Sequence, residues 1–191
     1  MQDHWSAPLS RGVKSSRQVT RDPDRTQDDI VPPDSPFVTL EEAQGFLDSA
    51  RGGRVLVVGD AMLDVYLRGS VDRISPEAPV PVIRVESEVS APGGAANVAM
   101  GAAALGADCR LVSAVGEDET ATILAERLET AGVPAADLVT MPHRPTTRKT
   151  RILARHQQML RVDREDPDPM AEEEHRRVAR AALDAFEWAD A

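Results

Sequence analysis

The segment Arg54-Val-Leu-Val-Val-Gly-Asp60 indicates the fold class. Its uninterrupted apolar run, Val55–Val58, predicts a strand that is buried on both faces. Such strands are typical of parallel sheets that helices cover on both sides. We therefore expect an α/β protein with a mostly parallel central sheet.

Patterns on both sides of this strand predict an alternation of helices and strands. Upstream, Thr39-Leu-Glu-Glu42 matches a helix-capping pattern, and apolar residues follow at helical spacing as far as Ala50. Downstream, the same reasoning predicts a helix of small residues before Gly106, helices over Glu119–Ala131 and Val178–Phe186, and strands over Leu111–Val115, Leu138–Met141, Lys149–Leu153 and Met159–Val162. We expect these strands to extend the central sheet.

The segment Val80–Val89 has a different pattern, because apolar and polar residues alternate in it. This alternation predicts a half-exposed strand. Proline cannot donate to a sheet ladder, so the prolines of this region favour an edge position or a small separate sheet. We expect this strand to lie outside the central sheet.

The two ends of the chain differ from its middle. Residues 1–38 lack a sustained apolar period, which predicts a disordered leader before a folded part over 39–191. In an alternating fold a further strand normally follows a helix such as the last one predicted, and none follows before Ala191. We therefore expect the C-terminal half of the fold to be missing.

Composition excludes several classes of function. The formal net charge is -10, with 32 acidic and 22 basic residues, which argues against a nucleic-acid partner. The chain has no apolar run of about 18 residues, so we expect no membrane span. With Cys109 as its only cysteine the protein cannot form an internal disulfide, which fits a cytoplasmic location. The four histidines lack metal-ligand spacing, and we expect no metal site.

Asp60 and Asp64 are the first candidate site residues. They follow the strand Val55–Val58, and ligands of open α/β sheets bind at the carboxyl ends of the strands. A carboxylate there can accept hydrogen bonds from two sugar hydroxyl groups. The alternative is that one of the two aspartates only caps a turn or a helix.

The turn Pro92-Gly-Gly-Ala-Ala-Asn97 is a second candidate. Adjacent glycines let the backbone approach a ligand closely, and Asn97 offers both a donor and an acceptor. The alternative is a turn needed only for packing. The turn matches neither the Gly-x-Gly-x-x-Gly pattern of dinucleotide folds nor the phosphate loop of nucleotide-binding proteins.

The segment Thr146-Thr-Arg-Lys-Thr-Arg151 is a third candidate, because its three cations and its hydroxyl groups suit a phosphate. In a strand, Lys149 and Arg151 share one face while Arg148 points to the other, so at most two of the cations reach one anion. The alternative is an exposed face of an edge strand.

Taken in order, these segments resemble the front part of the ribokinase-like (PfkB) carbohydrate kinases. The resemblance rests on Arg54–Tyr66, Asp72–Val82, Pro92–Ala99 and Pro145–Asp163. The second of these, which contains Arg-Ile-Ser-Pro-Glu-Ala-Pro-Val-Pro-Val, is typical of the heptose 7-phosphate kinases within the family. The resemblance runs from about Thr39 to the last residue.

The resemblance implies a three-layer fold with a small β lid at about 70–90, Asp72–Val89, that often pairs with its copy in a homodimer. It implies that Asp64 holds sugar hydroxyl groups. The other implied substrate-binding residues are Gly93, Gly94, Asn97, Lys149 and Arg151. The catalytic base of the family lies in a Gly-Ala-Gly-Asp motif, which this sequence lacks. We therefore assign no catalytic residue.

The implied reaction is the transfer of a phosphoryl group from ATP with Mg²⁺ to a sugar phosphate. The expected substrate is D-glycero-β-D-manno-heptose 7-phosphate, phosphorylated at its anomeric hydroxyl group in ADP-heptose and lipopolysaccharide core synthesis. Without the catalytic motif we expect the isolated chain to be inactive. Two alternatives stay open: a non-catalytic sugar-phosphate binding or dimerisation module, and a dinucleotide-binding domain, which the missing glycine pattern makes the weakest.

Overall fold

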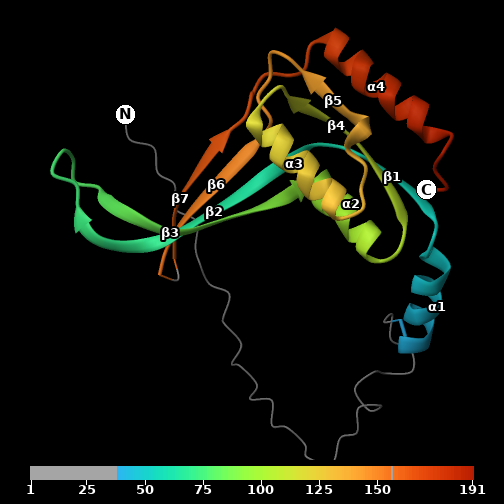
Figure 1. Cartoon of the computed structure of the whole chain (residues 1–191), viewed down its shortest axis with the longest axis horizontal. Coiled ribbons are helices and arrows are strands. Elements are labelled where there is room, and N and C mark those ends of the chain that lie inside the picture. Colours follow the sequence, from blue (N-terminus) through green and yellow to red (C-terminus); the bar gives the residue numbers. More distant parts are fainter. Residues whose placement is uncertain (1–37, 156) are drawn as a thin grey trace, which may run out of the picture. The chain divides into compact units, whose positions relative to one another are not determined.

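The computed structural model describes residues 38–155 and 157–191 (Figure 1). The predicted disordered leader, apart from Val38, lies outside the described residues. Residues Leu40–Ala191 form one compact unit. Its helices are α1 (Leu40–Ala50), α2 (Ala95–Ala104), α3 (Glu119–Thr130) and α4 (Glu172–Phe186). Its strands are β1 (Arg54–Val58), β2 (Ala61–Ile74), β3 (Pro81–Gly94), β4 (Asp108–Gly116), β5 (Leu138–Met141), β6 (Arg148–Ala154) and β7 (Gln157–Arg164).

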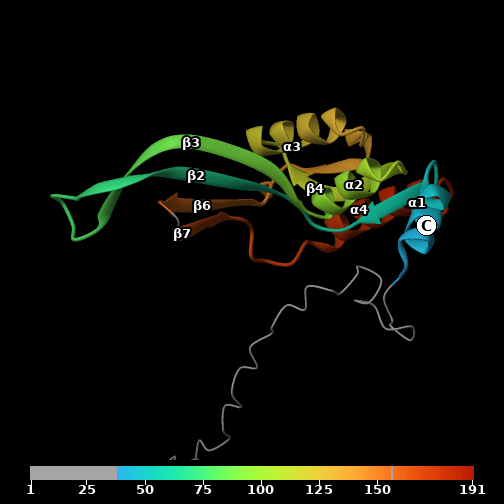
Figure 2. The same ribbon diagram turned by 90° about the horizontal axis from the view of Figure 1, so that it is seen from below.

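A three-stranded parallel sheet, in the order β1-β4-β5, lies at the centre of the fold. This confirms the α/β class and the parallel central sheet predicted from Val55–Val58. Successive side chains of β4 point to opposite faces. Cys109, Leu111 and Val115 share one face and join a buried core with α2 and α3, which lie on the same side of β4 in Figure 2.

The opposite face of β4 is covered by the segment that contains α4. Arg110 lies on this face, and its guanidinium carbon is 5.3 Å from the centre of the Trp188 ring just after α4. Arg110 also makes a two-pronged ion pair with Asp137, with distances of 2.7 and 2.6 Å. Helices therefore cover both faces of the central sheet, which gives the three layers that we expected.

A second, four-stranded sheet has the order β3-β2-β6-β7. Within it β2 and β6 are parallel, whereas β2–β3 and β6–β7 are antiparallel. The prediction that the strands over Lys149–Leu153 and Met159–Val162 extend the central sheet was wrong. Instead β6 pairs with β2, a 14-residue strand that the sequence analysis did not predict, and β7 pairs with β6.

β3 forms the outer edge of this second sheet, which confirms that the Val80–Val89 strand lies outside the central sheet. The far part of the β2–β3 hairpin extends away from the helices (Figure 2). A shift of register between Arg68 and Gly69 marks where this far part begins. Gly69 faces the backbone of Arg84 there, and a side chain at this position would collide with it.

The segment after α4 returns to the central sheet. The Leu56 amide donates to the carbonyl oxygen of Ala191 at 2.8 Å, and the Ala191 amide donates to the Arg54 carbonyl oxygen at 3.2 Å. This alternation is the pattern of a parallel pair. As expected, no strand follows α4 among the described residues, but Asp190 and Ala191 lie against β1. In the described part of the chain, no helix has the length and apolar character needed to cross a bilayer.

Candidate functional site

One face of the second sheet carries an ion pair between Asp64 and Arg151. Asp64 on β2 lies opposite Lys149 on the parallel strand β6, so the side chains of Asp64, Lys149 and Arg151 share this face. Arg151 Nη1 lies 2.5 Å from Asp64 Oδ1, and the two side chains are only 23% and 20% exposed. The hydrogen bond to Asp64 is the main cause that raises the pKa of Arg151, so the guanidinium group stays charged.

The guanidinium group of Arg151 also lies over the ring of Tyr66, 5.3 Å from its centre. Tyr66 is two residues beyond Asp64 on β2 and therefore lies on the same face. A cation held by a carboxylate and a ring face has little freedom to move. The position of Arg151 is thus fixed by two β2 side chains.

Lys149 is held by two carboxylates from the end of β7. Its Nζ lies 2.8 Å from Glu165 and 3.5 Å from Asp163, and its side chain is 19% exposed. The hydrogen bond to Glu165 is the main cause that raises the pKa of Lys149. Asp163 also accepts a hydrogen bond from Arg161 at 2.9 Å, which lowers the pKa of Asp163.

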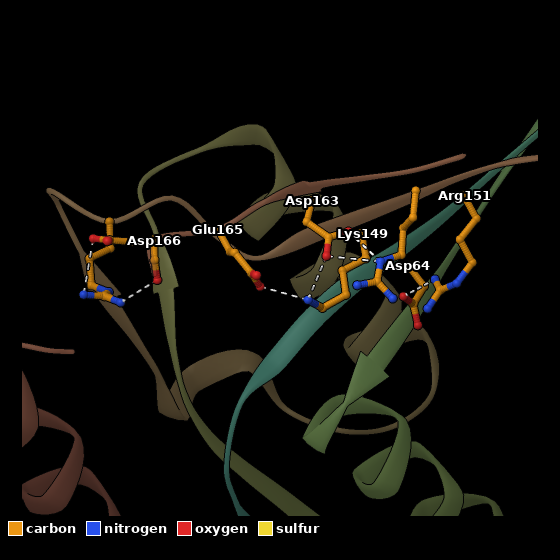
Figure 3. A network of polar contacts seen from close by, with 8 residues as sticks. Asp64, Lys149, Arg151, Asp163, Glu165 and Asp166 are labelled. Carbon is orange, nitrogen blue, oxygen red and sulfur yellow. Dashed lines mark hydrogen bonds and ion pairs between the residues drawn. The ribbon is translucent and has the colours of Figure 1, made fainter. Parts of the chain in front are cut away.

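Figure 3 shows these groups as a row of charged side chains that runs from Arg151 and Asp64, through Lys149, to Glu165 and Asp166. At the far end of the row Arg144 lies 3.3 Å from Asp166. The same guanidinium group donates to the carbonyl oxygen of Asp168 at 2.8 Å. The row therefore offers both carboxylate acceptors and cationic donors along one surface.

A cavity of about 330 Å³ lies beside this row. It is at the carboxyl ends of β1, β4 and β5, the edge of the sheet where ligands of this fold class bind. Its lining combines backbone, apolar and charged groups from Asp60, Ala61, Met62, Ala114, Val115, Met141, Arg144, Pro145, Thr147, Lys149, Glu165, Asp166 and Met170. Such a mixed lining suits a small polar ligand.

The glycine turn lies against Asp64. A β-carbon on Gly93 would be 2.6 Å from Asp64 Oδ2 and 3.0 Å from the Met62 side chain, so only glycine leaves the carboxylate in place. Gly94 precedes α2 with a φ of 59°, a conformation that residues with side chains rarely adopt. The turn is therefore built to bring backbone close to Asp64.

The structure thus groups Asp64, Gly93 and Arg151, with Lys149 on the same face and Gly94 next to Gly93. Asn97 is exposed on α2, and among the described residues no hydrogen bond joins its side chain to these five. Asp60, the other aspartate of the first motif, lines the cavity.

The cations of the third motif are already paired. Lys149 and Arg151 share a face, as the strand pattern predicted, and Arg148 points to the other face, where it lies 3.4 Å from Glu88. An incoming phosphate group must therefore compete with Asp64, Asp163 or Glu165 for these cations. The exchange of one anion for another keeps each cation partnered.

The sequence analysis did not select Arg144, Glu165 or Asp166. One signal was present, because Arg161, Asp163 and Glu165 alternate with a period of two and so lie on one face of a strand. Arg144 gave no such signal, since it lies in a connection. Within the described ranges, no three histidine, cysteine or acidic side chains are grouped so that they could hold a metal ion.

Known proteins resemble this chain in sequence and in fold. The family described as "pfkB family carbohydrate kinase" matches residues 53–189. A bifunctional protein HldE of Pseudomonas aeruginosa (strain LESB58) is 57% identical over 113 residues, which cover 59% of this chain and 24% of that protein. A bifunctional protein HldE of Pseudomonas putida (strain F1) is 52% identical over 120 residues, which cover 61% and 25%.

Among solved structures, a carbohydrate kinase from Agrobacterium tumefaciens is similar, with a TM-score of 0.56 and 26% sequence identity. The match covers 72% of this chain and 43% of that one. The chain spans about a quarter of the length of the curated relatives that it matches.

Proposed function

Because the chain belongs to the pfkB family of carbohydrate kinases, we propose that it binds the acceptor sugar of an ATP-dependent phosphoryl transfer. The family match over residues 53–189 carries this proposal, because these residues include the cavity and all strands of both sheets. The charged row beside the cavity supports it, since carboxylates accept hydrogen bonds from hydroxyl groups and cations bind phosphate.

The acceptor that we propose is D-glycero-β-D-manno-heptose 7-phosphate, phosphorylated at its anomeric hydroxyl group on the route to ADP-heptose. The resemblance of Asp72–Val82 to the heptose kinases supports this choice. Asp64 would accept hydrogen bonds from the sugar, and the sugar phosphate would exchange with a carboxylate on Lys149 or Arg151. The proposed substrate-binding set is Asp64, Gly93, Gly94, Asn97, Lys149 and Arg151.

In the proposed reaction the anomeric hydroxyl group gives its proton to a base that we do not assign to this chain. Its oxygen bonds to the γ-phosphorus of ATP, and ADP leaves as the bond from that phosphorus to the bridging oxygen breaks. Catalysis of such a transfer depends mostly on positioning and on charge stabilisation. We assign no residue of this chain to ATP or Mg²⁺, because the resemblance implies that the nucleotide site of the family is formed together with its Gly-Ala-Gly-Asp motif, which this sequence lacks. The need for ATP favours a cytoplasmic location.

We also propose that the segment Asp72–Val89, which contains most of the far part of the β2–β3 hairpin, is the lid of the sugar site. A lid that excludes water protects a phosphoryl group from hydrolysis. In this proposal residues 39–191 are the acceptor-binding portion of the kinase domain. The same surface would form a homodimer contact.

Calorimetric titration of the purified chain with heptose 7-phosphate tests the proposed substrate. We expect saturable binding that the Asp64→Asn substitution weakens at least tenfold, because the amide replaces one acceptor oxygen by a donor. We expect Lys149→Met to weaken binding of the phosphorylated sugar more than binding of the same heptose without its phosphate group. Equal affinities of the chain and its Asp64→Asn variant would refute the assignment of Asp64.

An assay of ADP release separates a kinase from a binding module. We expect the chain alone to bind the sugar phosphate without consuming ATP, because the Gly-Ala-Gly-Asp motif is absent from its sequence. ATP-dependent turnover by the purified chain would contradict this expectation. A sugar-phosphate binding module is the second candidate function, and the part-buried ion pairs beside the cavity favour it.

A further inference from the structure

Two polar residues outside the charged row connect the turn after β4 with the β5–β6 connection. Asp118 Oδ2 accepts a hydrogen bond from the Thr146 amide at 2.9 Å. Thr146 Oγ1 in turn accepts from the Gly116 amide at 2.8 Å. We call Asp118 and Thr146, with these two bonds, the clasp.

The clasp is closed off from water and tightly packed. Thr146 is 1% exposed, so its hydroxyl group and amide depend on the clasp for partners. A β-carbon on Gly116 would lie 2.7 Å from the Thr146 nitrogen and 2.9 Å from Asp118 Oδ2. The β5–β6 connection therefore packs tightly against the end of β4.

The carboxylate of Asp118 has a second task. Its Oδ1 accepts from the Ala121 amide at 2.9 Å and so caps α3. Burial would raise the pKa of Asp118, but the hydrogen bonds from Ala121 and Thr146 and the charge of Arg164 outweigh it and lower the pKa. Oδ1 of Asp118 thus caps α3, and Oδ2 binds the β5–β6 connection.

The connection held by the clasp supplies one wall of the cavity. Arg144, Pro145 and Thr147 lie on either side of Thr146 and line the cavity, and β6 with Lys149 begins directly afterwards. The Thr147 carbonyl oxygen also accepts from the Leu63 amide of β2 at 2.9 Å. A shift at Thr146 would therefore move Arg144 and the start of β6 together.

We propose that Asp118 and Thr146 are positioning residues that hold Arg144, Thr147 and Lys149 in place for the sugar phosphate. This inference rests on the proposed function, because it concerns the same cavity. Neither residue lines the cavity. Their effect on binding is indirect, through the β5–β6 connection.

Thr146→Val tests the clasp with little change of volume. It leaves the Gly116 amide buried without an acceptor, and the loss of such a bond corresponds to about tenfold in an equilibrium constant. We expect heptose 7-phosphate affinity to fall about tenfold and amide hydrogen exchange to rise selectively over residues 142–151. Thr146→Ser keeps the hydroxyl group, so we expect it to keep the affinity of the parent chain.

Two further variants separate positioning from stability and from helix capping. Val133→Ala removes buried volume beside α3, where Val133 is 0% exposed, without touching the clasp. We expect it to lower stability while affinity and exchange over 142–151 stay unchanged. Asp118→Ser keeps an N-cap oxygen for Ala121 but cannot reach Thr146. We expect it to raise exchange over 142–151 while α3 stays protected.

The inference is overturned if Thr146→Val and Val133→Ala, compared at equal fraction folded, have the same affinity and the same exchange over 142–151. If the parent chain does not bind heptose 7-phosphate at all, the proposed substrate fails. The exchange comparison then decides by itself whether the clasp holds the cavity wall.

Discussion

The absent side chain of Gly93 leaves the space that one oxygen of Asp64 occupies. The other oxygen is bound by Arg151. Asp64 is therefore fixed between a backbone turn and a cation, and its orientation toward a ligand depends on both.

We predict that Gly93→Ala weakens binding of heptose 7-phosphate at least tenfold and lowers stability by about 1 to 3 kcal/mol, since overpacking forces neighbours to move. The physical reason is the 2.6 Å distance from the new β-carbon to Asp64 Oδ2. Calorimetry and urea unfolding measure the two effects.

Gly101→Ala is the matched control, because a β-carbon there has no neighbour within 4 Å. Gly101 lies inside α2, so alanine should raise stability by up to about 1 kcal/mol and leave affinity unchanged. If both substitutions left affinity unchanged, Asp64 would not depend on the close approach of the turn.

The sequence analysis selected several residues that the structure brings together, but it did not predict how they pair. Two adjacent glycines indicate a close backbone approach from local chemistry alone. The partner of Arg151 comes from a segment remote in the chain, since Asp64 and Arg151 are 87 residues apart. The partners of Lys149 lie 14 and 16 residues away, at the end of the neighbouring strand. A local pattern carries no information on which carboxylate faces which cation.

The prediction of the strands was limited in the same way: their positions could be predicted from the sequence, but their pairing could not. The apolar runs that became β4, β5, β6 and β7 were predicted close to their observed positions, because period and composition are local properties. Membership of a sheet is decided by tertiary pairing, and β6 and β7 joined the second sheet. β2 was missed although Leu63, Val65 and Leu67 alternate with the polar residues Asp64 and Arg68.

The pairing of the last residues with β1 depends on charge. Arg54 holds the Asp190 carboxylate through its side chain, at 2.6 and 3.1 Å, and through its amide, at 3.0 Å. The side-chain hydrogen bond is the largest cause that lowers the pKa of Asp190 to about 2. An unfolded aspartate has a pKa of about 3.9.

A carboxyl group whose pKa is lowered by folding stabilises the folded state above its unfolded pKa. We predict that the contribution of Asp190 is complete above about pH 4 to 5 and is lost as the pH falls toward 2. The urea concentration at the midpoint of unfolding should therefore fall more steeply between about pH 5 and pH 3 for the parent chain than for the Asp190→Asn variant.

Arg54→Gln serves as the reciprocal variant, because it leaves the carboxylate and removes the cation. We expect its pH dependence to resemble that of Asp190→Asn. Parallel slopes for the parent chain and both variants would show that this ion pair adds nothing to stability.

On the scale of the whole unit, apolar side chains are exposed along the hairpin. Val85 and Val89 are 51% and 54% exposed on β3. We predict that the purified chain forms a dimer through this hairpin and that Val85→Glu combined with Val89→Glu shifts it to a monomer. The physical reason is that carboxylates buried at a contact are costly to desolvate. Sedimentation velocity measures the shift from dimer to monomer.

Val98→Glu is the control, since Val98 is 59% exposed on α2, away from the hairpin. It should leave the dimer intact. A chain that sediments as a monomer before any substitution would contradict the proposed contact.

The two sheets together form the proposed site: the central sheet supplies the carboxyl ends of its strands, and the second sheet supplies most of the charged row. Backbone amide NMR during titration with heptose 7-phosphate tests this account most directly. We predict saturable shifts concentrated at Asp64, Gly93 and Lys149 and along the β5–β6 connection, with little change in α4. Shifts that map to another surface, or none at saturating sugar phosphate, would contradict the assignment of this site.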